Sequence, residues 1–324
     1  MKAAYFEKTG GVEVLEFGER PDPICGVNDV LIRVRATSLD RFDIYGREAS
    51  HGMRWPLPHV GGGDIAGHIA EIGVGARESF PQLKVGDAVF ALGRHAHAEV
   101  AAAPAILTLP VPKGWSFESA AALPMAGRTA FDALNRIRIR SGEDVLIVAG
   151  ASGVGSYAIQ IARTAGCRVI TTVGSEDKFA KALETGAHEV INHYTEDGAA
   201  RVKGFTNGSG VHAVLDHVGT PMFDAAFESL RPNGRFVSTG VTAGHKASLH
   251  LGKLFFKGIE LHGIGRADQP SMRKSIEGLV ALAERGLLKP VVHTTFPLEQ
   301  IAEAHRLMES SRFFGKIVLT VAGT

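Results

Sequence analysis

The chain has 324 residues, of which 45% are hydrophobic and 21% are charged, and its formal net charge is +1. This length accommodates two domains with well-buried cores, and this balance is typical of a globular protein in water. Lysine and arginine are scattered and no apolar run approaches the roughly 20 residues of a membrane-spanning helix, so the sequence favours neither nucleic acid nor a membrane as a partner.

The start of the chain and its two cysteines favour a cytoplasmic location. Met1 leads directly into the strand-like segment 2–6, with no visible signal peptide. Cys25 and Cys167 lie far apart in the sequence and predict neither a disulfide framework nor a metal-ligand set.

The first third of the chain, to about Pro110, reads as β-rich. Residues 30–36 alternate in the manner of a half-buried strand. The segment 38–46 predicts a short helix with Ser38 as its N-cap. Three glycines at 61–63 run into the next strand, which indicates strained backbone or the close approach of another group.

The pattern changes near Trp115. Ser116 is the expected N-cap of a helix, and Pro124 separates that helix from a second one reaching about Arg138. Strands and helices then alternate, and the strands are near-continuous apolar runs, as in a parallel sheet buried on both faces. The expected strands are 144–149, 168–173, 189–191, 211–217 and 235–239, and the expected helices are 153–165, 177–185, about 197–203 and 221–230.

The end of the chain is too short for a third domain. A strand at 258–263, helices at about 271–285 and 298–309, and a strand at 315–321 are expected there. We therefore expect an α/β protein in which residues 1–117 begin a β-rich domain, residues 118–266 form a doubly wound Rossmann domain, and residues 267–324 return to complete the first domain.

The centre of this organisation is a dinucleotide-binding fingerprint. An apolar strand runs into Gly150-x-Ser152-x-x-Gly155 and then into an amphipathic helix, so the middle glycine of the usual G-x-G-x-x-G is a serine. The candidate diphosphate-binding residues are Gly150, Ala151, Ser152, Gly153, Val154 and Gly155. A purely structural strand-to-helix turn is the alternative, and the Ser152 hydroxyl either contacts the diphosphate or caps the helix.

The second Rossmann strand indicates which dinucleotide is bound. An acidic residue at its end would hold the ribose of NAD, but here Gly174 and Ser175 stand at that point, with Lys178 one turn later. Ser175 and Lys178 favour a 2′-phosphate and therefore NADP(H), although Glu176 and Asp177 partly oppose it. The alternative is an ordinary N-cap serine and a solvated lysine.

These motifs, in this order and spacing, resemble the medium-chain dehydrogenase/reductase superfamily, and within it the zinc-free quinone oxidoreductase branch related to ζ-crystallin. The resemblance covers nearly the whole chain. It rests on the segments 1–4, 29–34, 61–67, 85–89, 150–160, 174–178, 214–219 and 314–319. It implies that the β-rich domain is a GroES-like catalytic domain beside an NADP(H)-binding Rossmann domain.

The resemblance also implies that no metal is bound. Asp40, Gly63 and Met125 match the positions of the catalytic zinc ligands in zinc-dependent relatives; glycine has no ligating side chain and methionine is a poor ligand for Zn²⁺. The four-cysteine structural lobe is missing. Of the 14 histidines, His95 and His97 have no carboxylate or cysteine partner at useful spacing, and His51 and His59 lie in an irregular loop, so we expect solvent-exposed or hydrogen-bonded structural histidines.

Without zinc there is no Lewis acid to stabilise an alkoxide, whereas hydride delivery to a small hydrophobic acceptor with an extended π-system remains feasible. The implied reaction is reduction of a quinone by NADPH, with water able to supply the proton. By resemblance Asp40, where most relatives carry asparagine, lies by the nicotinamide. Tyr45 is a candidate donor to a quinone oxygen, or else a packed aromatic residue.

Further cofactor contacts are implied by the resemblance alone. They are Thr129, Tyr194, Gly240, Val241, Ile264 and Lys316. Thr129 is otherwise an ordinary helix-start threonine, and Lys316 is otherwise a surface residue of the last strand.

The apolar segment 254–261 precedes the last Rossmann strand, which in relatives pairs with its twofold mate, so a homodimer is expected; internal core is the alternative. Two other functions stay open. One is an NADPH-dependent reductase of enone, enal or acryloyl double bonds, and the other is a non-catalytic NADPH-binding protein.

Overall fold

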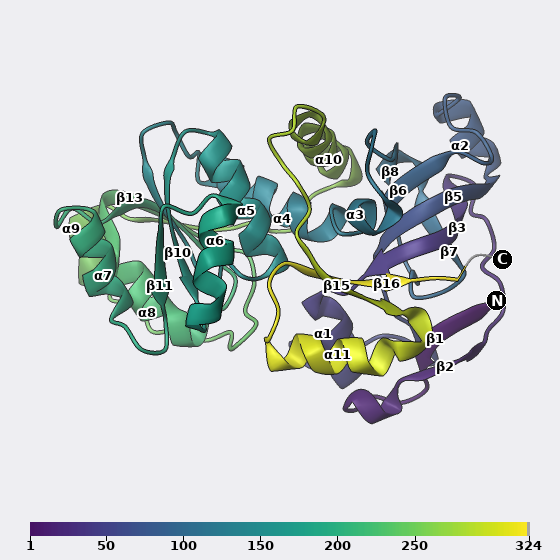
Figure 1. Ribbon diagram of the computed structural model, residues 1–324, viewed down its shortest axis with the longest axis horizontal. Coiled ribbons are helices and arrows are strands. Elements are labelled where there is room, and N and C mark those ends of the chain that lie inside the picture. The colour runs from purple at the N-terminus through teal and green to yellow at the C-terminus, as the bar shows by residue number, and fades with distance from the viewer. Residues whose placement is uncertain (323–324) are drawn as a thin grey trace. The chain divides into compact units, whose positions relative to one another are not determined.

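A computed structural model describes residues 1–322, which form two compact units. Unit 1 comprises Met1–Ala126 together with the chain from Asp268 onward, and unit 2 comprises Gly127–Ala267. The end of the chain returns to the first lobe, because strand β16 (Lys316–Thr320) pairs antiparallel with β3 (Asp29–Ser38). In Figure 1 the yellow C-terminal strands lie beside the purple and blue strands of that lobe.

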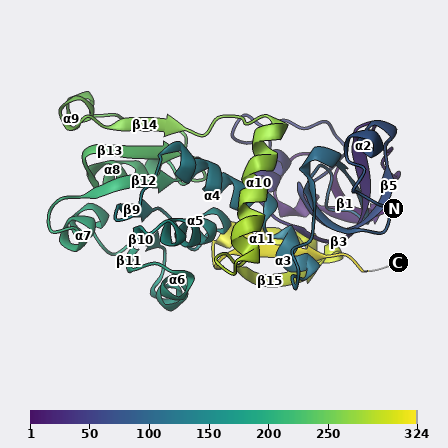
Figure 2. The same ribbon diagram turned by 90° about the horizontal axis from the view of Figure 1, so that it is seen from above.

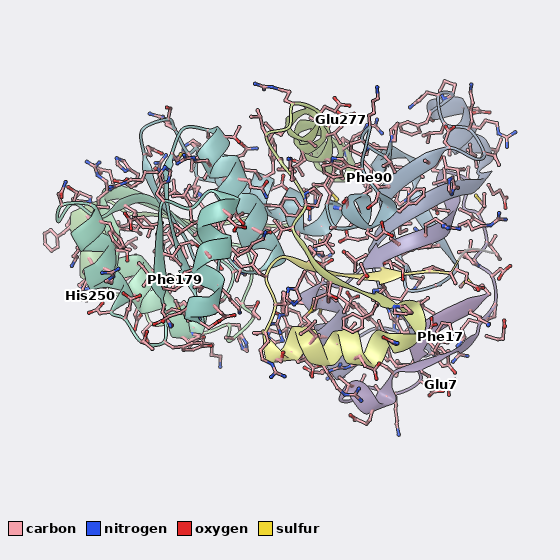
Figure 3. All side chains as sticks on the ribbon, in the orientation of Figure 1. Glu7, Phe17, Phe90, Phe179, His250 and Glu277 are labelled. Atoms are coloured by element: carbon pink, nitrogen blue, oxygen red, sulfur yellow. The ribbon has the colours of Figure 1, made fainter. Side chains whose placement is uncertain are left out.

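Unit 1 is β-rich and mostly antiparallel. A three-stranded sheet has the order β2-β1-β4, and a seven-stranded sheet has the order β15-β16-β3-β5-β6-β8, with β7 paired to β3. The strands not yet given are β1 (Lys2–Phe6), β2 (Glu16–Glu19), β4 (His59–Val60), β5 (Asp64–Ile72), β6 (Ala88–Leu92), β7 (Val100–Pro104), β8 (Thr108–Pro110) and β15 (Val292–Pro297). Buried side chains of these strands form a hydrophobic core, and Figure 3 labels a further buried residue of the unit, Phe90 of β6.

Short helices cover this unit. They are η1 (Val12–Val14), α1 (Arg41–Glu48), α2 (Val74–Ser79), η2 (Ala105–Leu107), α3 (Phe117–Ala121), α10 (Gln269–Glu284), η4 (Leu298–Gln300) and α11 (Ile301–Ser310), while α4 (Pro124–Arg136) crosses the boundary between the units. Ser116 caps α3 as predicted. The prediction of Ser38 as a cap was wrong: Asp40 is the N-cap of α1, because Ser38 still belongs to β3 and its hydroxyl donates to the Asp64 carboxylate.

Unit 2 is a doubly wound α/β domain. Its sheet is parallel throughout, with the strand order β11-β10-β9-β12-β13-β14, and Figure 2 shows β14 at one edge. The strands are β9 (Asp144–Ile147), β10 (Arg168–Val173), β11 (Glu189–Asn192), β12 (Val211–Asp216), β13 (Leu230–Ser238) and β14 (Glu260–Gly263). The helices are α5 (Gly153–Thr164), η3 (Glu176–Lys178), α6 (Phe179–Thr185), α7 (Gly198–Phe205), α8 (Thr220–Glu228) and α9 (Leu251–Lys257).

This strand order confirms the expected fold class. The order reverses between β9 and β12, and in such sheets ligands bind at the carboxyl ends of the strands beside that point. Within residues 1–322 no helix is long and apolar enough to cross a lipid bilayer.

Candidate active site

The fingerprint turn leaves the carboxyl end of β9, beside the reversal in strand order. The Gly150 amide donates to the carbonyl of Thr172 in β10 at 2.8 Å, which fixes the turn against the neighbouring strand. A Cβ on Gly155 would stand 2.5 Å from Ala149 O and 2.6 Å from Gly150 Cα. Only glycine allows this approach of helix to turn, which is the close packing that a dinucleotide-binding turn requires.

Ser152 caps α5. Its Oγ accepts a hydrogen bond from the Gly155 amide at 2.9 Å and lies 2.8 Å from His217 Nε2. The helix N-terminus still offers backbone N–H groups and a partial positive charge to a diphosphate. His217 follows β12, 65 residues from Ser152, and no motif in the sequence marks it as a partner of that serine.

His217 is held in turn by the chain after β13. Thr242 Oγ1 donates to the His217 carbonyl at 3.0 Å, and a Cβ on Gly240 would stand 2.9 Å from that oxygen. Gly240 and Val241, two predicted cofactor contacts, thus lie in a segment linked to the fingerprint turn through His217, whose carbonyl faces the segment and whose ring faces Ser152. Ile264 lies just beyond β14 and is half-buried.

The end of β10 gathers the residues predicted to read the 2′-phosphate. Ser175 precedes the 3-10 turn that ends at Lys178, and its side chain makes no capping bond. Burial lowers the pKa of Lys178, and Asp177 partly offsets this effect. Tyr194 is 80% exposed, and its ring lies over Gly174, where a Cβ would stand 3.0 Å from Cε2.

In unit 1, Asp40 and Lys316 form part of a buried charge cluster. The Lys316 ammonium donates to Leu39 O at 2.9 Å, to Asp40 Oδ1 at 2.6 Å and to Asp64 Oδ2 at 3.2 Å. The Asp64 side chain also accepts from Ser38 Oγ at 2.7 Å. Lys316 is buried, so it is no surface residue of the last strand, and its three ammonium hydrogens already have protein acceptors.

Burial dominates the ionisation of this cluster. It raises the pKa of Asp64 to about 7, an effect that the charge of Asp40 increases and that of Lys316 opposes. Burial alone would lower the pKa of Lys316, but the two carboxylates reverse this and leave it raised. One ammonium thus faces two carboxyl groups in unit 1.

The residues at the matched metal positions lie together but do not fit zinc. The Met125 amide donates to Asp64 Oδ1 at 2.8 Å, and a Cβ on Gly63 would stand 4.0 Å from Met125 Cε. The cation that Asp40 and Asp64 contact is the ammonium of Lys316. Across residues 1–322, no group of three or more His, Cys, Asp or Glu side chains is arranged to hold a metal ion.

One of the histidines expected to be solvent-exposed or hydrogen-bonded lies in the interior of unit 1. His97 is buried, and within residues 1–322 its Nε2 has no hydrogen-bond partner. Burial lowers its pKa, and the nearby Asp43 carboxylate opposes this. The His97 ring also hydrogen-bonds to the backbone of Ser38, which agrees with the expected structural role.

The last two candidates lie on helices. The Tyr45 ring of α1 stacks on His51, with 3.9 Å between ring centroids and 25° between planes. This packing agrees with the aromatic alternative and does not test a contact with the acceptor. Thr129 is buried in the interior of α4, five residues beyond its start, so it is not a helix-start threonine.

Two family models match the chain. One describes an alcohol dehydrogenase GroES-like domain and matches residues 26–113, and the other describes a zinc-binding dehydrogenase and matches residues 153–284. The chain is 32% identical to a quinone oxidoreductase of Pseudomonas aeruginosa, over 98% of this chain and 99% of that protein.

Solved structures agree over the full length. A structure described as an NAD-dependent alcohol dehydrogenase has a TM-score of 0.91 and 34% identity, with 99% of this chain and 100% of that one covered. The quinone oxidoreductase of Escherichia coli complexed with NADPH has a TM-score of 0.89 and 29% identity, with the same coverage.

Proposed function

The chain belongs to the medium-chain dehydrogenase/reductase superfamily, as a quinone oxidoreductase-like enzyme, and from that premise we propose that it transfers hydride from NADPH to a quinone-type acceptor without zinc. The observation that carries the proposal is the pair of sites described above. Unit 2 has a dinucleotide-binding turn with a lysine just after the end of β10, and unit 1 has an ammonium in contact with Asp40, one of the three positions matched to zinc ligands.

The residues of unit 2 would hold NADPH by its phosphates. The backbone of Gly150–Gly155 and the N-terminus of α5 bind the diphosphate, and Ser175 and Lys178 bind the 2′-phosphate. When bound, NADPH supplies a hydride to an electron-poor acceptor. The positive charge of Lys178 matches the 2′-phosphate dianion of NADP(H). NAD(H) has no such phosphate, and this difference is the basis of the proposed preference.

The residues of unit 1 act by position and charge. Lys316 fixes the Asp40 carboxylate, which leaves that side chain as a hydrogen-bond acceptor at the start of α1. Because no Lewis acid is built from Asp40, Gly63 and Met125, an alkoxide gains no metal stabilisation in this proposal. A quinone spreads the incoming charge over its ring and needs no such aid.

A steady-state acceptor panel tests the proposal. NADPH oxidation is measured with quinones, enones and enals, with NADH in place of NADPH, and in reverse with primary and secondary alcohols. We expect quinones with NADPH to give the highest kcat/KM. A higher kcat/KM for enones would favour double-bond reduction, alcohol oxidation with NAD⁺ would overturn the proposal, and tight NADPH binding without turnover would indicate a non-catalytic protein.

We also propose a homodimer formed through the edge of the unit 2 sheet. β14 is an edge strand with Leu261 41% exposed, and the preceding helix α9 exposes Phe255 (77%) and Phe256 (85%). A second copy pairing along β14 would bury these side chains. Light scattering of Phe256→Glu should give a monomer where the unaltered chain gives a dimer; a monomeric unaltered chain would overturn this assembly.

A further inference from the structure

The carboxyl ends of β10 and β11 bring an imidazole to the proposed phosphate site. His193 follows β11 directly, and its amide donates to Val173 O at 3.0 Å. A Cβ on Gly174 would stand 3.4 Å from His193 Nε2. The ring therefore lies over the glycine that ends β10, where the ribose of a bound dinucleotide is expected.

The surrounding hydrogen bonds indicate which ring nitrogen faces outward. His193 Nδ1 lies 3.3 Å from Thr172 Oγ1, and that oxygen accepts from the Ala149 amide at 2.9 Å. The Thr172 hydroxyl can donate its own hydrogen to Nδ1 or accept a second bond from it. The contact therefore engages Nδ1 in either tautomer of the ring. Within residues 1–322, Nε2 itself has no hydrogen-bond partner, so it is available to an acceptor.

Few charges face this ring. Burial and then the positive charge of Lys178 lower the pKa of His193, so the imidazole is neutral in the ligand-free protein at neutral pH. Tyr194 packs edge-on against it at 4.5 Å. His193 and Glu196 line one cavity, but the Glu196 carboxylate accepts from the Asn192 amide at 2.7 Å and pairs with Arg201 at 2.7 Å.

We propose that His193 is a third side chain of the 2′-phosphate site, beside Ser175 and Lys178, and that it takes up a proton when a 2′-phosphorylated dinucleotide binds. A phosphate dianion next to Nε2 favours the imidazolium, which donates a charge-assisted hydrogen bond. NAD(H) carries no charge at this point and leaves the ring neutral. The inference rests on the proposed use of NADP(H) and not on the identity of the acceptor.

Proton uptake makes the cofactor preference depend on pH. The imidazole has a lower pKa in the free protein than in the complex, so between these two values binding consumes a proton, and affinity rises as pH falls. The limit is about tenfold in the dissociation constant per pH unit for one linked proton. The phosphate itself begins to protonate near pH 6, so the effect is sought above about pH 6.5.

The experiment measures dissociation constants of NADPH and NADH by cofactor fluorescence between about pH 6.5 and 8.5. The variant is His193→Asn, which keeps a polar group near Thr172 but cannot become a cation. The control is His250→Asn, at the N-cap of α9, where asparagine caps equally well; Figure 3 labels His250. Calorimetry in buffers of different ionisation heat counts the protons taken up.

In the unaltered chain and in His250→Asn, the ratio of the NADH to the NADPH dissociation constant should rise toward low pH. Proton uptake by the protein should accompany the binding of NADPH but not the binding of NADH. In His193→Asn the ratio should be several-fold lower at pH 6.5 and should not rise, while NADH binding stays unchanged and shows that the fold is intact. A ratio that has the same pH dependence in His193→Asn, or equal proton uptake with NADH, would overturn the inference and leave the proposed reaction standing. A chain that does not prefer NADPH at any pH would overturn both.

Discussion

Lys316→Met removes the only ammonium that Asp40 and Asp64 contact among the described residues and leaves two carboxylates in the interior of unit 1. Methionine keeps most of the apolar stem of lysine, so the lost packing is small. Removing one partner from a buried ion pair costs about 3–5 kcal/mol. At about 2–4 °C per kcal/mol for a domain of this size, the melting temperature of unit 1 should fall by roughly 6–20 °C.

The loss should depend on pH. The pKa of Asp64 is raised from 3.8 to about 7 in the folded chain, so the native state binds more protons than the unfolded state between these values. The stability from this group is complete below about pH 4 and is lost as pH rises toward 7. Without Lys316 this pKa rises further, so the deficit of Lys316→Met should be smaller at pH 5, where Asp64 is protonated, than at pH 8.

Tryptophan fluorescence reports this unit alone, because Trp55 and Trp115, the two tryptophans of the chain, both belong to unit 1. Thermal unfolding is followed at pH 5 and pH 8. Adding Asp64→Asn to Lys316→Met removes one of the facing charges and should recover part of the loss. Arg306→Met, which breaks an exposed pair with Glu303, should change stability by less than about 1 kcal/mol.

The reasoning would be refuted by a deficit of the same size at both pH values, or by a double variant no more stable than Lys316→Met. Either result would mean that Lys316 contributes by packing and not by charge.

Three further outcomes are expected. Lys178→Ala should weaken NADPH binding by roughly 10- to 100-fold, the value of one hydrogen bond to a charged group, and leave NADH binding unchanged; unchanged NADPH binding would place the phosphate elsewhere. Gly155→Ala forces a methyl group against the Ala149 carbonyl and should destabilise unit 2 by about 1–3 kcal/mol, as measured by calorimetric unfolding. It should also weaken the binding of NADPH and NADH to the same extent, as measured by fluorescence titration. Prolonged dialysis against EDTA should leave quinone reduction intact; activity lost together with a stoichiometric metal would contradict a zinc-independent reaction.

Features that depend only on short stretches of sequence could be predicted. The apolar strands, the turn Gly150–Gly155 and the cap at Ser116 depend on neighbours in the chain, and the structure has them at the expected places. The return of the last strand to the first lobe followed from the element count. The Ser38 cap failed because the end of a strand depends on its partner strand, and β3 pairs with β5 as far as Ser38 and Asp64.

The sequence by itself determined the class of fold, the dinucleotide turn and the residue types at the lost metal positions, because each is a local pattern or a single substitution. Only the tertiary structure brought Lys316 to Asp40, 276 residues away, His217 to Ser152, and His193 over Gly174. Such pairs leave no periodicity in the chain. Their partners are chosen by strand order and by the need of each buried polar group for a counterpart, and both exist only after the sheets have assembled.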